Sequence, residues 1–176
     1  KSAGSIAVPG KRLKRADRRR VRDLQRMIRG RLRHGHTLAV KKLIKTGEVK
    51  RLFSAAQYDQ AKAQLGQGYF SAGRDEWALM WAGRAAGRSS KVLPEAHWTA
   101  GLAAWRLKKF DAAAVHFEAV ANNGDASPWL MSAGAFWAAR SHLVNRQPAK
   151  VNPLLKAAAE HPRTFYGILA GYMLGR

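Results

Sequence analysis

Helical periodicity runs through nearly the whole chain and restricts its fold more than any other feature. Apolar residues recur three and four positions apart in one segment after another, and no run alternates strictly between apolar and polar residues. Since such alternation is typical of a half-buried strand, the pattern predicts an all-α protein. Beyond residue 51 the segments expected to be helical are 55–71, 75–87, 94–107, 111–122, 128–145, 149–160 and 163–174.

Residues typical of helix starts support several of these boundaries. Pro128 follows Ser127, which suits a Ser N-cap with Pro in the first turn. Pro94 is expected to begin its helix in the same way, and Asp111 is expected to be the N-cap of the following segment.

The spacing of small and aromatic residues predicts that the helices pair. Gly101, Ala113 and Phe117, with Phe110 between two segments, follow the small, small, aromatic order of a tetratricopeptide-type hairpin. Small residues let two antiparallel helices approach, and the aromatic rings fill the groove shared with the next hairpin. We therefore expect a tetratricopeptide-like stack of helical hairpins that forms a curved superhelix.

Six Trp residues lie in this helical part. Trp77 and Trp81 are four residues apart, and Trp98 and Trp105 are seven apart, so each pair falls on one helix face. The pairs would form either a platform for sugar rings or bases, or the apolar seams between repeats. Seams are the favoured interpretation, because large apolar residues at helical spacing usually belong to a core.

Positive charge divides the chain into two parts. The net charge is +21, and residues 1–51 carry +15 of it against +6 for residues 52–176. This indicates a basic N-terminal arm over 1–51 with one or two amphipathic helices, followed by a helical-repeat domain over 52–176. The first arm helix is expected within 11–33, and the second over 37–46 with Gly47 as a left-handed cap.

The arm supplies the candidate binding residues. An arginine-rich helix attracts an anionic polymer, an acidic partner protein, nucleic acid or an anionic lipid surface. Nucleic acid is the less favoured partner, because residues 1–51 contain no Trp, Tyr or Phe to stack on bases. If the arm acts as a separable recruiting element, deletion of 1–33 abolishes binding and leaves the repeat domain folded. The candidate residues are Arg15, Arg18, Arg19, Arg22, Arg26 and Arg29.

The sequence offers little for catalysis or cofactor binding. It has no Cys, no pair of His at metal-ligand spacing on a helix, and no glycine-rich nucleotide motif or nucleophile elbow. We therefore predict no catalytic residue, no metal and no cofactor. No apolar run is long enough to span a bilayer, and no apolar leader segment lies between Lys1 and Lys11.

Several segments resemble the α-superhelical region of soluble lytic murein transglycosylases. The resemblance extends from about residue 78 to 175 and is carried by 97–107 (HWTAGLAAWRL), 110–117 (FDAAAVHF), 127–129 (SPW), 135–140 (AFWAAR) and 162–170 (PRTFYGILA). It implies a periplasmic bacterial protein in which stacked helices stand beside a lysozyme-like catalytic domain. In that family the catalytic domain follows the Phe-Tyr-Gly helix.

The family's catalytic acid belongs to a Glu-Ser pair that this chain lacks. Its five Glu residues are followed by Val49, Trp77, Ala96, Ala119 and His161. The resemblance therefore implies a non-catalytic scaffold that presents peptidoglycan (murein) to an adjacent catalytic domain in cell-wall turnover. The alternative is a helical-repeat adaptor that binds an anionic partner through the basic arm.

The last segment, 163–174, is expected to be a packed closing helix. Four residues, Phe165, Ile168, Leu169 and Tyr172, recur at helical spacing, which predicts that Phe165 is buried. Gly167 and Gly171, four residues apart, are expected to admit a neighbouring helix.

Overall fold

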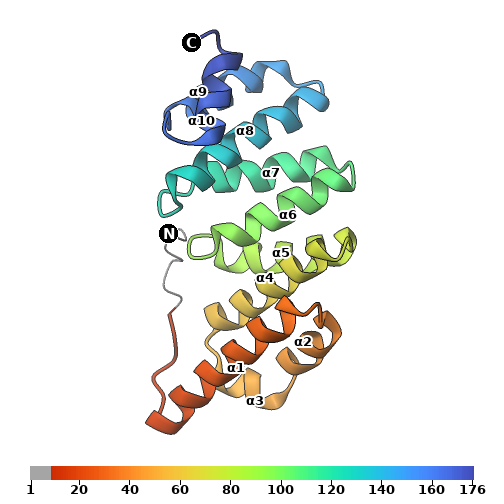
Figure 1. Cartoon of the computed structure of the whole chain (residues 1–176), viewed down its shortest axis with the longest axis vertical. Coiled ribbons are helices and arrows are strands. Elements are labelled where there is room, and N and C mark those ends of the chain that lie inside the picture. The colour runs from red at the N-terminus through yellow and green to blue at the C-terminus, as the bar shows by residue number, and fades with distance from the viewer. Residues whose placement is uncertain (1–8) are drawn as a thin grey trace.

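The computed structural model describes residues 9–176, and within that range every regular element is helical. The helices form an elongated stack with α1 near one end and α10 near the other (Figure 1). Their bounds are α1 Arg15–Arg33, α2 Thr37–Ile44, α3 Gly47–Leu52, α4 Ala55–Ser71, α5 Asp75–Ser89, α6 Pro94–Arg106, α7 Phe110–Ala121, α8 Pro128–Val144, α9 Val151–Ala159 and α10 Phe165–Met173, with a 3₁₀ turn at Pro148–Lys150.

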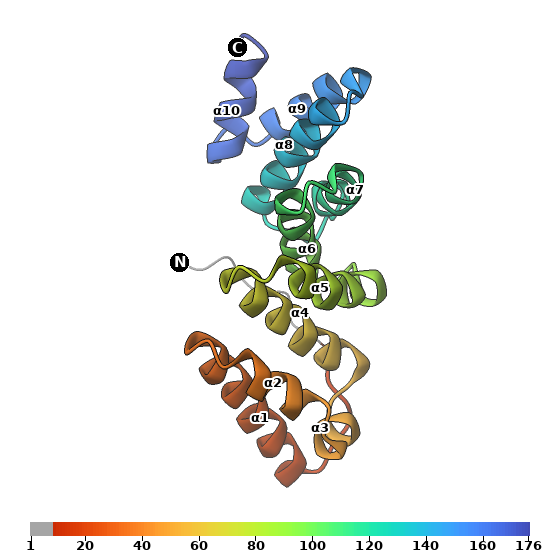
Figure 2. The same ribbon diagram turned by 90° about the vertical axis from the view of Figure 1, so that its right-hand side faces the viewer.

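From α4 onward, each helix packs against the next one along the chain. The helix axes change direction from one end of the stack to the other, as in a superhelix (Figure 2). The expected all-α stack of hairpins is thus confirmed, and the helix bounds differ from the expected segments by at most a few residues, except that α3 is a third N-terminal helix that was not expected. Helix starts and stops follow local signals, which explains this agreement.

The N-terminal helices share a core with the stack. Val21, Leu24 and Ile28 on α1 are buried in one cluster with Leu65 of α4, and α1 contacts α2, α3 and α4. Deletion of 1–33 would therefore expose a core that α4 helps to form. The expectation that the repeat domain stays folded after this deletion is accordingly not supported, because α1 packs as part of the fold.

Two of the expected caps are present. The Ser127 hydroxyl accepts a hydrogen bond from the backbone N–H of Leu130 at 3.3 Å, and Pro128 is the first residue of α8. Pro94 begins α6 in the same position. The missing N–H of Pro costs nothing there, because the first helical N–H groups have no partner within the helix.

Two other caps were wrongly expected. Lys109 is the N-cap of α7 and Asp111 lies inside its first turn, where a carboxylate still favours the positive end of the helix. Gly47 does not close α2 but begins α3. Its predecessor Thr46 caps α3 by accepting a hydrogen bond from Val49 N–H, so a local side-chain contact restarts the helix at that point.

Glycines set the spacing between helices where the hairpins cross. A Cβ at Gly101 would lie 2.6 Å from Cε1 of Phe117, so the ring occupies the space that a side chain would need. A Cβ at Gly134 would lie 2.8 Å from the backbone oxygen of Phe117. The small residues therefore let α6, α7 and α8 pack closely, as the spacing predicted, but Gly101 makes room for the Phe117 ring itself, a contact that the spacing did not predict.

The Trp residues fill seams only in part. Trp81 is buried, and Trp105 packs edge to face on Trp137 with 5.2 Å between ring centroids. Trp77 is 43% exposed, so the seam interpretation is wrong for it, and Trp129 is exposed to a similar extent. Helical spacing places residues on one face of a helix, but the neighbouring helix determines how much of that face is covered.

The prediction that Phe165 is buried is wrong. Its side chain is 66% exposed, and Ile168 and Tyr172 on the same face are also exposed. The buried side of α10 consists of Gly167 and Ala170, and Figure 2 shows the helix at the outer end of the stack. These apolar residues do share one face of α10, but no element of residues 9–176 covers that face.

The two glycines of α10 also serve a different purpose from the expected one. A Cβ at Gly167 would lie 2.0 Å from the backbone oxygen of His161, so this glycine accommodates the preceding loop and not a neighbouring helix. A Cβ at Gly171 would meet no atom within 4 Å.

Candidate functional site

The six candidate arginines form one face of α1. With 100° between successive residues they fall within an arc of about 100°, and every one is exposed. Arg26 pairs with Asp23 at 3.3 Å. The other five make no ion pair within residues 9–176. We call Arg15, Arg18, Arg19, Arg22, Arg26 and Arg29 the arginine face; from Arg15 to Arg29 it extends along about 21 Å of helix axis.

Packing on the opposite side of α1 directs this face outward. The buried stripe of Val21, Leu24 and Ile28 points into the core. Because the helical repeat places the buried residues and the six arginines on opposite sides of α1, burial of the stripe leaves the arginines exposed. Arg15, Arg19 and Arg22 also surround an open hollow of about 650 Å³ over Ala16.

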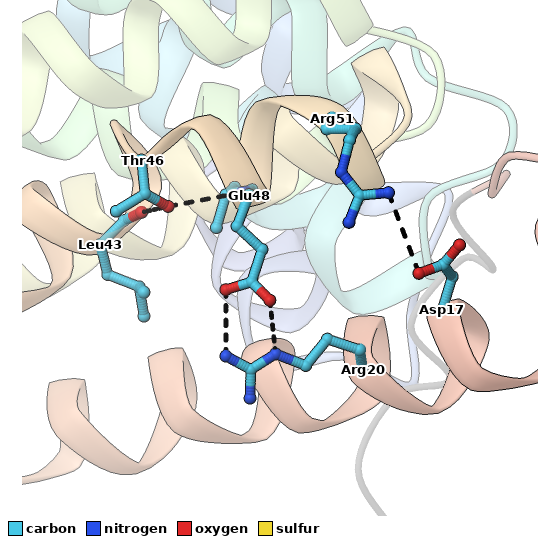
Figure 3. A network of polar contacts seen from close by, with 7 residues as sticks. Asp17, Arg20, Leu43, Thr46, Glu48 and Arg51 are labelled. Carbon is cyan, nitrogen blue, oxygen red and sulfur yellow. Dashed lines mark hydrogen bonds and ion pairs between the residues drawn. The ribbon is translucent and has the colours of Figure 1, made fainter.

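An ion-pair network holds α1 against α3 (Figure 3). Arg20 donates from Nε and Nη2 to the two carboxylate oxygens of Glu48 at 2.7 and 3.0 Å, and Arg51 lies 3.9 Å from Asp17. The hydrogen bond from Arg20 holds the pKa of Glu48 below its usual value. Arg20 is thus paired within the fold and does not belong to the arginine face.

The turn between α2 and α3 positions Glu48 for this pairing. The Thr46 hydroxyl donates to the backbone oxygen of Leu43 at 2.8 Å while it caps α3 (Figure 3). Glu48 lies in the first turn of α3, where its negative charge is favourable.

The glutamates do not form a catalytic pair in the described part of the chain. Glu48 is paired with Arg20, and Glu118 accepts a hydrogen bond from the buried His142. Glu76, Glu95 and Glu160 are exposed. Glycosidic cleavage needs a carboxyl held in an apolar environment to protonate the leaving oxygen, and none of the exposed three has that environment.

Two buried polar clusters were not anticipated from the sequence. Asp59 is 1% exposed and accepts hydrogen bonds from Lys62, Arg88 and Ser89 at 2.9–3.3 Å. The only signal in the sequence was the spacing of Asp59 and Lys62, three residues apart on one helix. This cluster ties α4 to the end of α5.

The second cluster joins α6 and α7. Nδ1 of His97 lies 3.0 Å from Nδ1 of His116, and Nε2 of His97 lies 3.0 Å from the Ser90 hydroxyl. Burial lowers the pKa of His97, and burial together with the neighbouring His97 lowers the pKa of His116 to about 4. Both rings are therefore neutral near pH 7, so one Nδ1 donates to the other.

Further features of residues 9–176 bear on function. No group of three or more His, Asp or Glu residues is placed to hold a metal ion. No helix in this range is both long enough and apolar enough to cross a membrane. Comparison with protein-family models, curated proteins and solved structures finds no match to the chain.

Proposed function

We propose that this chain is the non-catalytic helical scaffold of a soluble lytic murein transglycosylase. In this role it presents peptidoglycan in the periplasm to an adjacent catalytic domain. The proposal rests first on the similarity of residues 97–107, 110–117, 127–129, 135–140 and 162–170 to that family, and it agrees with the all-α stack of hairpins.

The exposed apolar face of α10 is the observation that carries the proposal. Phe165 and Ile168 belong to the PRTFYGILA segment and Tyr172 lies two residues beyond it, and all three are at least half exposed. An apolar stripe of this kind usually packs against another element. In the family that the segment resembles, the catalytic domain follows this helix, so that domain would cover the stripe.

Binding to murein tests the proposal. The purified chain is mixed with murein sacculi at about 150 mM salt, where surface attraction is screened beyond about 8 Å. We expect it to sediment with the sacculi more than a helical protein of equal net charge does. Equal sedimentation of the two proteins would contradict the proposal.

Activity of the isolated chain gives a second test. Because Glu48 is paired with Arg20, Glu118 with His142, and the other glutamates of residues 9–176 are exposed, we expect no soluble anhydromuropeptides from sacculi incubated with the chain alone. Release of such products would show that the chain is itself an enzyme, and Glu76→Gln and Glu95→Gln would then be the first variants to assay.

The exposed arginine face favours one alternative, a helical-repeat adaptor for an anionic partner. Its test replaces Arg15, Arg19 and Arg22 with Gln, because deletion of α1 would open the core. If the chain is an adaptor, the wild type should bind a polyanion such as polyglutamate saturably, and the triple variant should lose this binding. The wild type should then sediment with sacculi no more than the control protein of equal net charge does. The scaffold proposal predicts that it sediments more than that control protein.

A further inference from the structure

A groove between α1 and α4 lies beside the arginine face. Arg29, Leu32 and Arg33 line one wall from the last turns of α1, and the opposite wall comes from α4. The groove encloses about 520 Å³, which is within the range of about 300–1,000 Å³ for small-ligand sites. The lining residues from α4 are Gln64, Gln67, Gly68 and Ser71.

Packing of Leu32 on Gly68 gives the groove its depth. A Cβ at Gly68 would lie 2.9 Å from Cδ2 of Leu32 and 3.3 Å from Cγ2 of Thr37, so the absence of a side chain lets α1 and α2 approach α4. These residues provide an apolar floor. The polar side chains stand around it because Arg29 and Arg33 are one turn apart on α1, as Gln67 and Ser71 are on α4.

The polar side chains of the groove have no partners in the described part of the chain. Arg29 and Arg33 make no ion pair, and Gln64, Gln67 and Ser71 make no side-chain hydrogen bond, within residues 9–176. No acidic residue lines the groove. Two guanidinium groups, two amides and a hydroxyl are thus available to a ligand at one place.

The chemistry of these groups defines the ligand. Guanidinium groups bind a carboxylate through two parallel hydrogen bonds. Gln and Ser side chains both donate and accept, so they suit a ligand with hydroxyl or amide groups, whereas a phosphodiester offers acceptors only. No aromatic side chain lines the groove to stack on a base. These properties favour an acidic glycopeptide over nucleic acid.

We infer that this groove binds the free carboxylate of an acidic glycopeptide, with Arg29 and Arg33 holding the carboxylate and Gln64 and Gln67 bonding to neighbouring amide or hydroxyl groups. The choice of a murein glycopeptide as this ligand rests on the proposed function. The arginine face continues from the groove along α1 and attracts further acidic units of the same strand.

Titration with a defined murein unit tests the inference. The probe is a disaccharide-tetrapeptide released from murein by a muramidase, added to the full chain at about 150 mM salt and followed by calorimetry. Arg29→Gln/Arg33→Gln should bind at least about tenfold more weakly, the loss expected from one charge-assisted hydrogen bond. The matched control is Arg84→Gln/Arg163→Gln, which removes the same charge from exposed positions outside the groove and should bind like the wild type.

Variants that conserve charge separate a defined site from general attraction. Arg29→Lys/Arg33→Lys keeps both charges but not the planar fork, and Gln64→Ala/Gln67→Ala changes no charge. Both pairs should weaken binding of the probe. The same probe with its carboxylates amidated should bind no better to the wild type than to Arg29→Gln/Arg33→Gln. Circular dichroism checks that each variant remains folded.

Several results would overturn the inference. The inference is wrong if the groove variants and the control variant weaken binding of the probe equally, or if Arg29→Lys/Arg33→Lys binds the probe as tightly as the wild type does. It is also wrong if the wild type binds the amidated probe as tightly as the acidic probe. Finally, it is wrong if a single-stranded oligonucleotide binds more tightly than the probe and the groove variants lose that binding. If the wild type sediments with sacculi and the groove variants do so equally, the inference fails and the proposed function stands. If the wild type binds neither sacculi nor the probe, both fail.

Discussion

The imidazole rings of His97 and His116 face each other with their Nδ1 atoms 3.0 Å apart. Burial lowers the pKa of both, and that of His116 falls to about 4. In the unfolded chain an ordinary His titrates near 6.5. Between pH 6.5 and 4 the unfolded state therefore binds more protons than the folded state, so the free energy of unfolding decreases as the pH falls through this window.

We expect this effect to be visible in urea denaturation at pH 7 and pH 5. His116→Gln should lose less stability between the two pH values than the wild type, because it removes a group whose pKa burial lowers to about 4. The contribution of His116 is at most about 3 kcal/mol over the full window. His34→Gln, at an exposed position, is the control and should behave like the wild type. An unchanged pH dependence in His116→Gln would contradict the assignment.

Two phenylalanines should respond very differently to truncation. Phe117 is fully buried between α6, α7 and α8, so Phe117→Ala should lower the free energy of unfolding by about 3–5 kcal/mol. Phe165→Ala removes a mostly exposed ring and should cost less than about 1 kcal/mol. Chemical denaturation of both variants provides the comparison. A loss of several kcal/mol in Phe165→Ala would show that α10 is covered in solution.

Alanine substitutions at two glycines should have opposite signs. At Gly134 a Cβ would lie 2.8 Å from backbone atoms of α7, so Gly134→Ala should destabilise the protein by at least about 2 kcal/mol through forced backbone movement. At Gly30, inside α1, a Cβ would meet nothing within 4 Å, and Gly30→Ala should stabilise by about 0.5–1 kcal/mol. Thermal unfolding of both variants tests the pair, and a stabilising Gly134→Ala would contradict the close packing of α7 and α8.

The buried carboxylate of Asp59 should matter more than a surface one. Asp59→Asn leaves Arg88 and Lys62 without their counter-charge and should cost about 3 kcal/mol. Asp23→Asn breaks an exposed pair with Arg26 and should change stability by less than about 1 kcal/mol. Urea denaturation at pH 7 measures both variants. Equal small losses would mean that Asp59 is solvated in solution.

Much of the candidate site could be predicted from residue spacing, and part of it could not. The arginine face follows from the order of the residues in α1, because 100° per residue places all six arginines on one side. The groove beside that face needs Gln64 and Gln67, which lie more than 30 residues away from Arg29 and Arg33. No local pattern brings them together, since their approach depends on Leu32 packing against Gly68.

The same division holds for the whole chain. The sequence by itself determined the positions of most helices and the close approach of α6 and α7 at small residues, because periodicity, caps and small-residue spacing act over a few residues or one hairpin. Only the tertiary structure decided that Phe165 is exposed and that Asp59 is buried. Burial depends on which distant helix covers a given face, and the periodicity of one helix contains no information about its neighbours.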